Sequence, residues 1–529
     1  MAASSFRRTV DRLGVVACAA YAVVAVLSYG QVTILWSLPD FPNAIAYFTQ
    51  VAGEPAIASI RDFFGGPWGV LITRWVPVTI AASTAVTLLI MLGRNRREAD
   101  DEVADAILRW SMVFAGICFF AYPVFTQDFW LSAIWGEMVV SGTNPYQHKF
   151  TPEMIQALPL DHFPMTMSYG PFWAVISAAV MAIAGNSLIV AALIFKAILL
   201  AAWCGTIILV DRLVRQVAPD NRAFALTVVG WLPVGVLETV AEGHNDIALV
   251  FPALVWLALL LRGNAKAPIA LAASVLCKYT TAPFFLIDFL HCLKGQRMSL
   301  GAYVSRGVPA AIFGILVMAI FYRGASFFDG ARLVDSWHFM QPSDAYLAIT
   351  DFLGGWGEPL ENLFLTIFPG IALYQLAVYW KQSDTEQLFR LTLASICAIS
   401  FAAIGHVWSW YLVWMLPLAA LVPGWWLARF IVGMTLAAPF LPLLWWVPEV
   451  EEYKNVAALV LYLAATGWTI LSAPKQVESA EGAAAAPVRL IDFAKARDKL
   501  LGRVNTARAE PELEPELARP VRAAASGEH

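Results

Sequence analysis

The chain contains 529 residues, of which 59% are hydrophobic and only 14% are charged, and its mean hydropathy is +0.65. Ordinary soluble domains are about half apolar and about a quarter charged, so this composition excludes a soluble enzyme. The formal net charge of −4 says little about partners, because in a membrane protein the placement of Lys and Arg in the loops carries the information. We expect no nucleic acid among its partners.

Apolar segments of the length that a transmembrane helix needs, about 20 residues, recur along most of the chain. The predicted spans cover 14–36, 69–92, 107–126, 188–210, 223–241, 245–261, 304–322, 360–380, 388–405, 408–428, 429–447 and 455–472. Two further apolar stretches, 169–185 and 267–290, end at or are interrupted by polar residues, which favours broken or re-entrant hairpins. The sequence therefore predicts an all-α polytopic membrane protein with about 12 to 14 transmembrane or re-entrant helices.

Clusters of Lys and Arg in short loops mark the cytoplasmic side of a membrane protein. If 169–185 and 267–290 each return to their own side, the basic residues that fall together are Arg7, Arg8, Arg12, Arg94, Arg96, Arg97, Arg212, Arg215, Arg222, Arg262, Lys266, Lys294, Arg297, Lys381 and Arg390. That side is then cytoplasmic, and the other polar segments face outward. In the alternative, both stretches cross fully and the arginines of 211–266 move outside.

The sequence divides into three parts. Residues 1–98 form an N-terminal extension with two spans, residues 99–472 form the main transmembrane domain, and residues 473–529 form a tail. The first apolar run has no small-residue cleavage site, so we expect a retained span and not a signal peptide. The tail is predicted to be cytoplasmic, with an amphipathic helix at 488–504 followed by a disordered segment.

The first polar cluster follows the third predicted span. Asp128 stands where that helix leaves the bilayer, and Glu137, Asn144 and Tyr146 come after it. A carboxylate in this place is partly desolvated and can accept a proton from a substrate hydroxyl. The alternative is an acid at a helix end that simply reaches water.

The second and third clusters lie further along the chain. His244, Asn245 and Asp246 fall in a compact turn between two apolar spans, and Lys278 stands beside Tyr279 inside an apolar stretch. An ammonium at membrane depth is costly, so its default partner is an anion. A structural pairing of Lys278 with Asp246 or Asp288 and snorkelling to the surface are the alternatives.

Two aromatic segments complete the candidate site. His406 precedes Trp408, Trp410 and Tyr411, where clustered aromatic residues otherwise indicate an interfacial belt. The polar residues of the 323–358 loop, which is otherwise read as a solvated loop, include Arg323 and His338. The sequence contains no phosphate-binding P-loop, metal motif or nucleophile elbow, and its six cysteines are dispersed without metal-type spacing.

These segments together resemble the polytopic GT-C glycosyltransferases, in particular bacterial polyprenol-phosphate-mannose-dependent mannosyltransferases. The residues that carry the resemblance are, in chain order, Asp128, Asn144-Pro145-Tyr146, Tyr169-Gly170-Pro171, Gly243-His244-Asn245-Asp246, Lys278-Tyr279 and the run from Trp410-Tyr411 to Pro417. The chain departs from the family pattern in its N-terminal extension and at Ile134-Trp135-Gly136-Glu137. The departure at 134–137 leaves the identity of the sugar open.

The resemblance implies a GT-C-like bundle in the bacterial inner membrane, with active-site loops on the external, periplasmic face and 99–472 as the catalytic domain. It implies inverting transfer of a sugar from a polyprenyl-phosphate donor to a glycolipid or polysaccharide hydroxyl, with Asp128 as the base. Because a departing phosphate needs positive charge nearby, the expected donor-phosphate ligands are Lys278, His244, Arg323 and His406. The expected substrate-binding residues are Glu137, Asn144, Tyr146, Tyr169, Asn245, Asp246, Tyr279, His338, Trp408, Trp410 and Tyr411.

We expect no cofactor and no required metal, although the sequence leaves Glu137 and Asp246 open as metal ligands. Besides mannose, the sequence leaves arabinose and galacturonate open as the sugar. The rival function is a transporter or flippase, in which the same intramembrane charges would line a translocation path. Recognisable inverted repeats, which many transporters carry, are absent from the sequence.

Overall fold

The computed structural model describes residues 2–35, 55, 59, 62, 65, 67–94, 99–126, 128–151, 165–185, 187–321, 358–403, 407–440 and 454–472. Every regular element in these segments is a helix, which confirms the predicted all-α class. Residues 1–474 form one compact unit. The predicted site residues Arg323, His338 and His406 lie outside the described residues, as does the tail after residue 472.

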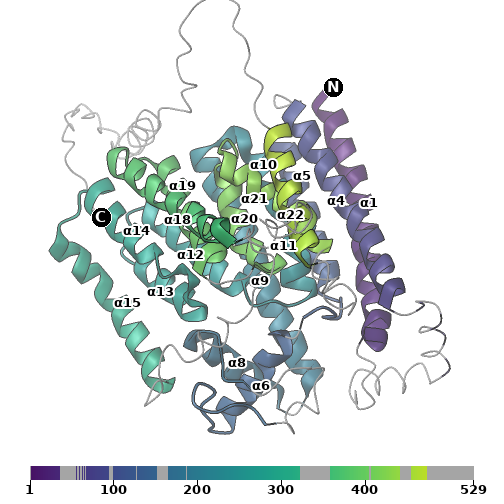
Figure 1. The fold of residues 1–529 in the computed structure, drawn as a ribbon, viewed down its shortest axis with the longest axis horizontal. Coiled ribbons are helices and arrows are strands. Elements are labelled where there is room, and N and C mark those ends of the chain that lie inside the picture. Colours follow the sequence, from purple (N-terminus) through teal and green to yellow (C-terminus); the bar gives the residue numbers. More distant parts are fainter. Residues whose placement is uncertain are drawn as a thin grey trace, which may run out of the picture. The chain divides into compact units, whose positions relative to one another are not determined.

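The first two long helices, α1 (Ala2–Leu35) and α4 (Pro67–Arg94), pack side by side at one edge of the bundle (Figure 1). Helix α1 also packs against α5 (Asp101–Cys118). Helix α5 begins after Asp100, whose carboxylate accepts a hydrogen bond from the backbone N–H of Val103 at 2.9 Å. This contact is the N-cap that satisfies a free donor in the first turn.

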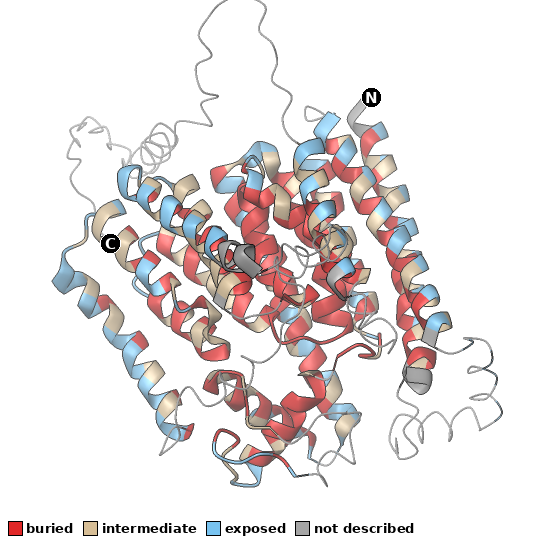
Figure 2. Cartoon of the chain, in the orientation of Figure 1, coloured by how far each residue is buried: buried red, intermediate tan, exposed pale blue. Residues whose placement is uncertain are grey.

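A group of central helices forms the core, where most of the buried residues gather (Figure 2). The central elements are α9 (Leu188–Val217), η2 (Pro219–Asn221), α10 (Arg222–Gly230), α11 (Pro233–Val236), η3 (Leu237–Ala241) and α20 (Leu412–Leu421). The chain bends by 53° between α10 and the α11–η3 pair, and Pro233 opens the second half. Proline lacks the N–H that would continue the helical ladder, so the bend falls there.

Two short helices, α6 (Asp128–Val140) and α8 (Pro171–Ala184), pack against each other at the bottom of Figure 1. They approach closely at Gly136, where a Cβ atom would lie 2.5 Å from the carbonyl oxygen of Ser177. The sequence predicts no helix in this segment, which follows the third predicted span, so α6 is an addition to the expected elements. The run from Phe129 onward is apolar and buries its side chains against α8, although its 13 residues are too few to span a bilayer.

The predicted interruption near Lys278 is present. Lys278 adopts an extended conformation and separates α13 from the helical turn that follows it. The elements of this region are α12 (Ile247–Leu261), α13 (Ala267–Cys277), η4 (Tyr279–Thr281), α14 (Phe284–Leu290), η5 (His291–Gly295) and α15 (Leu300–Phe321). Helix α12 packs against α13, and α13 against α15, so the broken stretch folds beside the central helices.

The last part of the described chain packs around α20. Its elements are α18 (Glu358–Lys381), α19 (Thr385–Ala398), η6 (Ile399–Ala403), η7 (Ser409–Tyr411), α21 (Trp426–Ala437), η8 (Ala438–Phe440) and α22 (Lys454–Leu471). Helices α19 and α21 both contact α20. The turn η7 leads directly into α20 and so places its aromatic residues beside the central helices.

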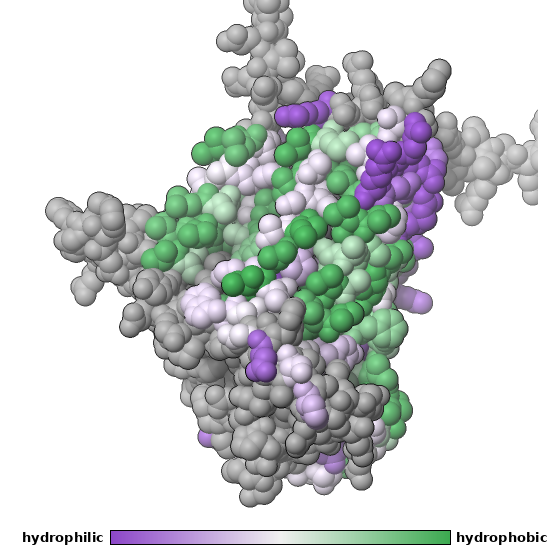
Figure 3. Space-filling model, turned by 90° about the vertical axis from the view of Figure 1, so that its right-hand side faces the viewer, coloured by the Kyte–Doolittle hydropathy of each residue, from purple (hydrophilic) through white to green (hydrophobic). Residues whose placement is uncertain are grey.

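Several helices have the length and the apolar composition of transmembrane helices. Those long and apolar enough to cross a membrane are Ser5–Gln31, Trp68–Arg94, Leu188–Val217 and Leu300–Phe321, with the bent pair around Pro233 as a fifth. Figure 3, which looks onto the side that carries α1, shows a largely hydrophobic surface with hydrophilic residues gathered toward its upper end. The chain therefore has the surface of a membrane protein, and among the described residues four or five helices reach spanning length.

Candidate active site

Three of the polar clusters that the sequence singles out meet at one end of the central helices. Asp128 opens α6, His244 lies in the turn between η3 and α12, and Lys278 lies at the break after α13. The ring of Trp410, from η7, stacks on the imidazole of His244 with the two centroids 4.0 Å apart. Segments more than 250 residues apart in sequence, from 128 to 410, thus share one site.

Asp128 and His244 form the centre of this site. The carboxylate Oδ2 of Asp128 lies 3.4 Å from Nδ1 of His244, and the Asp128 side chain is 26% exposed whereas His244 is 1% exposed. The hydroxyl of Tyr169 also bonds to the Asp128 carboxylate. Burial by itself raises the pKa of Asp128, but the hydrogen bond and charge of His244, with Lys278 nearby, outweigh it and lower that pKa to about 2.

A second acid lies on the other side of the imidazole. Nε2 of His244 is 3.5 Å from Oε2 of Glu238, and Oε1 of Glu238 accepts a hydrogen bond of 2.7 Å from the hydroxyl of Ser409. Burial lowers the pKa of His244, but Asp128, Glu238 and Asp246 together raise it above its usual range. The imidazole therefore lies between two carboxyl groups that favour its charged form.

The backbone of the 242–246 turn needs a glycine next to His244. Gly243 has a φ of +80°, and a Cβ atom there would lie 2.6 Å from the ring of Phe129. A side chain at this position would meet both the strain of a left-handed conformation and the first turn of α6. Gly243 thus allows the turn to approach the helix that carries Asp128.

Lys278 pairs within the protein. Its Nζ lies 2.8 Å from Oδ1 of Asp246 and faces the rings of Tyr411 and Trp414, at 4.7 and 4.8 Å from their centroids. The same carboxylate oxygen accepts a 2.6 Å hydrogen bond from Trp414. Asp246 is fully buried, and its Oδ2 has no hydrogen-bond partner, nor has Oδ1 of Asn245. The unpartnered Oδ2 belongs to the same carboxylate that binds the Lys278 ammonium.

The other predicted residues either bond to the backbone near the site or stack on its aromatic rings. Tyr146 donates its hydroxyl to the backbone carbonyl of Tyr169 at 2.8 Å, and Asn144 bonds to the backbone of Tyr146 and of Phe321. Trp408 stacks on the Trp410 ring at 4.8 Å. Asn144 and Tyr146 therefore shape the segments around the site, whereas Trp408 extends the stack of rings that begins at His244.

Glu137 lies away from the Asp128–His244 pair, whereas Tyr279 directly follows Lys278 in the chain. Glu137 is half-buried on α6, nine residues after Asp128, which places it about 13 Å further along the helix. Tyr279 is half-buried in η4. Among the residues that the structure describes, no group of three or more His, Cys, Asp or Glu side chains is arranged to hold a metal ion.

Sequence reasoning missed two buried charges at the site. Glu238 contacts His244, as described above, and Arg74 of α4 forms an ion pair with Glu242. Both stand inside apolar runs, and a charge at membrane depth is a signal of a functional or paired residue. The sequence does not reveal the partners, because Arg74 and Glu242 are 168 positions apart.

Residues 13–291 match the model of the MptA_B family, which is described as "Alpha-(1->6)-mannopyranosyltransferase, N-terminal domain". The match begins within α1 and ends in η5. It therefore includes most of the N-terminal extension as well as Asp128, His244 and Lys278. Neither the curated proteins nor the solved structures contain a match to the chain.

Proposed function

The chain belongs to the MptA_B family of alpha-(1->6)-mannopyranosyltransferases, and from this premise we propose that it transfers mannose from a polyprenyl phosphate to an acceptor hydroxyl. The acceptor in this proposal is a glycolipid or a polysaccharide. Membership of the family agrees with the mannosyltransferase resemblance of the sequence and establishes a sugar transferase. The observation that carries the finer proposal is the pairing of Asp128 with His244 next to the Lys278–Asp246 pair.

In the proposed reaction Asp128 acts as the general base. Its carboxylate takes the proton from the acceptor hydroxyl while the hydroxyl oxygen forms a bond to the anomeric carbon of the sugar. The bond from that carbon to the phosphate oxygen breaks on the opposite face, and the phosphate leaves with the electron pair. The configuration at the anomeric carbon is inverted. His244 orients the carboxylate by its contact at 3.4 Å.

Lys278 is the described cation best suited to the leaving phosphate. It is 16% exposed while its partner Asp246 is fully buried, so the ammonium can face a ligand without leaving its counter-charge. Positive charge at the site where negative charge grows stabilises the transition state. Arg323 and His406 stay predictions for the same role, as does a direct contact of His244 with the phosphate.

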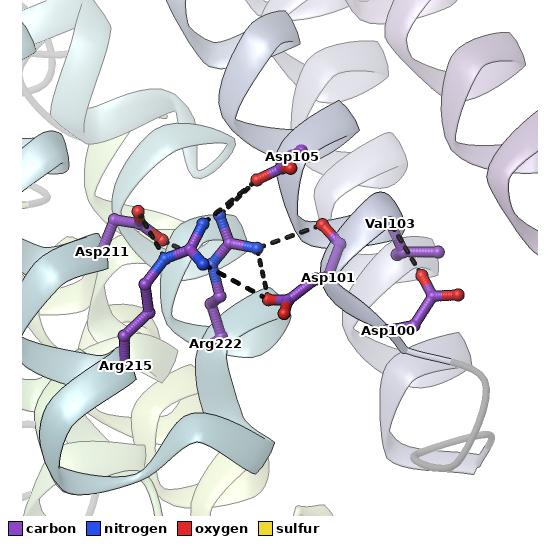
Figure 4. A network of polar contacts seen from close by, with 7 residues as sticks. All are labelled: Asp100, Asp101, Val103, Asp105, Asp211, Arg215 and Arg222. Atoms are coloured by element: carbon purple, nitrogen blue, oxygen red, sulfur yellow. Dashed lines mark hydrogen bonds and ion pairs between the residues drawn. The ribbon is translucent and has the colours of Figure 1, made fainter. Parts of the chain in front are cut away.

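We place the site on the external face of the bacterial inner membrane, with both termini in the cytoplasm. Support comes from Figure 4, in which Asp101, Asp105, Asp211, Arg215 and Arg222 gather from α5, α9 and α10. The chain runs from Arg222 to the turn after η3 in 20 residues, and this bent pair of helices is together long and apolar enough for one span. Arginine-rich ends belong to the cytoplasmic side.

The proposal also assigns a role to each of the three parts of the chain. We assign residues 99–472 as the catalytic domain, with residues 1–98 as a two-span part before it and 473–529 as a cytoplasmic tail. Helices shorter than a full span, such as α6 and α8, are counted with the long ones in the proposed bundle of about 12 to 14 transmembrane or re-entrant helices.

The proposal is tested with purified protein in lipid nanodiscs, radiolabelled polyprenyl-phosphate sugars and a membrane extract as the source of acceptor. We expect label transfer from the mannose donor. Asp128→Asn keeps the size of the side chain but removes the proton acceptor, so kcat should fall at least about 100-fold. Asp220→Asn, at an exposed acid in η2, is the matched control and should leave kcat unchanged.

Two results would contradict the proposal. Near-normal turnover by folded Asp128→Asn protein would reject Asp128 as the base. Movement of an intact lipid-linked sugar across the bilayer of proteoliposomes, with no transfer of label to an acceptor, would favour the transporter alternative instead.

A further inference from the structure

A buried ion pair joins the N-terminal extension to the candidate site. Arg74, on α4, lies with its Nη2 2.5 Å from Oε1 of Glu242, and the two side chains are 3% and 4% exposed. Arg74 stands inside a helix long and apolar enough to span a membrane. A guanidinium at such a depth is costly unless it is paired, so the contact with Glu242 explains why α4 tolerates it.

The other oxygen of Glu242 holds the backbone that leads to Asp128. Oε2 accepts hydrogen bonds from the backbone N–H groups of Val124, at 2.8 Å, and Phe125, at 2.9 Å. Residues 119–126 form no regular helix between the end of α5 and the start of α6, and the backbone turn bonds that follow α5 end at the N–H of Ala121. The Glu242 carboxylate supplies two of the missing acceptors.

A second buried cation, Lys196, links the start of this connection to the end of η3. The ammonium of Lys196, on α9, donates to the backbone carbonyls of Cys118, Ala121 and Ala241, with distances of 3.4, 2.5 and 2.9 Å. These carbonyls belong to the end of α5, the segment after it and the end of η3. One lysine therefore joins the backbone segment before Asp128 to the backbone segment before His244.

A purely stabilising role explains the Arg74 pair poorly. Buried ion pairs contribute little more to stability than apolar side chains of the same size would, and Nη1 of Arg74 has no hydrogen-bond partner. What the pair does provide is a fixed position for the Glu242 carboxylate, and through it for Val124 and Phe125. Asp128 follows Phe125 by only three residues.

We infer that Arg74 is a positioning residue for the proposed base: it acts through Glu242 on the backbone of Val124 and Phe125 and so sets where the Asp128 carboxylate lies. The inference rests on the proposed role of Asp128. Under this inference, α4 of the N-terminal extension contributes to the geometry of the site and does more than hold the chain in the membrane. Displacing a catalytic group by about 1 Å costs about 100-fold in rate, so loss of this support should be visible in kcat.

The first experiment needs no substrate. Amide hydrogen exchange is measured on the parent, on Arg74→Met and on Arg306→Met, all in nanodiscs. Arg306 is the matched control, because it is equally buried and pairs with the buried Asp288 at 2.8 Å. We expect the N–H groups of Val124 and Phe125 to exchange at least about 10-fold faster in Arg74→Met and to be unchanged in Arg306→Met.

The second experiment is a double-mutant cycle on label transfer from polyprenyl-phosphate mannose. Arg74→Met should lower kcat about 100-fold with the donor KM unchanged, and should lower it no further when Asp128→Asn is already present. If Arg74→Met does not fold, the double variant of Arg74→Met with Glu242→Gln leaves no unpaired buried charge and takes its place in both experiments.

The outcomes separate this inference from the proposed function. Unchanged exchange at Val124 and Phe125 overturns the inference whatever the reaction is. Faster exchange with additive effects of Arg74→Met and Asp128→Asn on kcat shows ordering of the segment without positioning of the base, and also overturns it. Full turnover by Asp128→Asn rejects the base itself, and the inference falls with it.

Discussion

His244 and Asp128 decide over which pH range the site keeps its charges. The pKa of Asp128 is lowered to about 2, so its carboxylate is ionised at neutral pH, whereas the neighbouring carboxyl groups outweigh burial and raise the pKa of His244 above its usual range. As pH falls, Asp128 stays a carboxylate until about pH 2, which removes it as a cause of any acid limb above pH 4. As pH rises through the raised pKa of His244, the imidazole loses its charge and its hold on Asp128 weakens.

We therefore expect kcat to fall on the alkaline side through loss of the His244 proton, and we assign any acid limb to Glu238, whose pKa is raised by burial, and not to Asp128. A pH profile of kcat with saturating donor measures this. His244→Gln should lower kcat and abolish the alkaline limb, whereas His148→Gln, at an exposed histidine after α6, should keep it. An alkaline limb that persists in His244→Gln would assign the titration to another group.

Lys278 allows a second prediction, because the structure gives it a partner that the sequence named only as an alternative. Lys278→Met leaves the fully buried Asp246 with only the Trp414 hydrogen bond. Breaking a buried pair from one side costs about 3 to 5 kcal/mol, so the melting temperature should drop. Adding Asp246→Asn removes the stranded charge and should restore stability.

The restored double variant also reports on the phosphate. If Lys278 contacts the donor, the variant carrying Lys278→Met and Asp246→Asn should melt near the parent yet bind polyprenyl-phosphate mannose about 10-fold to 150-fold more weakly. Thermal unfolding and donor binding on one sample decide the matter. Parent-like donor binding in the stable double variant would confine Lys278 to a structural role.

At the scale of elements, Arg222 ties α5, α9 and α10 together (Figure 4). Its guanidinium is 4% exposed and contacts Asp211 at 2.6 Å, Asp101 at 2.7 Å and also Asp105. These acids belong to α5 and α9, whereas Arg222 begins α10. Its neighbour Arg215 contacts the same acids but is 44% exposed.

We expect Arg222→Met to destabilise the protein by about 2 to 3 kcal/mol, because Asp211 loses its contact with a buried guanidinium and keeps only that with the half-exposed Arg215. Arg215→Met, the matched control, should cost less than about 1 kcal/mol, as solvent-exposed pairs do. Thermal unfolding in nanodiscs measures both. Equal losses for the two variants would show that burial does not set the strength of this network.

Sequence reasoning worked best where a single residue breaks a pattern. Lys278 interrupts an apolar run, and the helix breaks there. The all-α class and the meeting of Asp128, His244 and Trp410 were likewise open to prediction. The helix α6 was missed, because 13 apolar residues are too few for a span and their burial depends on α8, which the sequence cannot position.

At the scale of the whole molecule, the arrangement of charge predicts how the chain sits in its membrane. The Arg222 cluster lies at one end of α5, α9 and α10, and Asp128 and His244 lie at the far end of the same helical path. Basic clusters are retained in the cytoplasm. The polar loops around the site should then face outward, including the exposed His148.

Cysteine labelling in intact cells tests this orientation. His148→Cys, in the exposed segment after α6, should react with a membrane-impermeant thiol reagent in intact cells. Ala265→Cys, exposed between α12 and α13, and Asp220→Cys, exposed beside Arg222, should react only after permeabilisation. The parent protein corrects for its six natural cysteines. Because α12 runs from the site turn to the Ala265 loop, labelling of Ala265→Cys in intact cells would reverse the proposed orientation and place Asp128 on the cytoplasmic side.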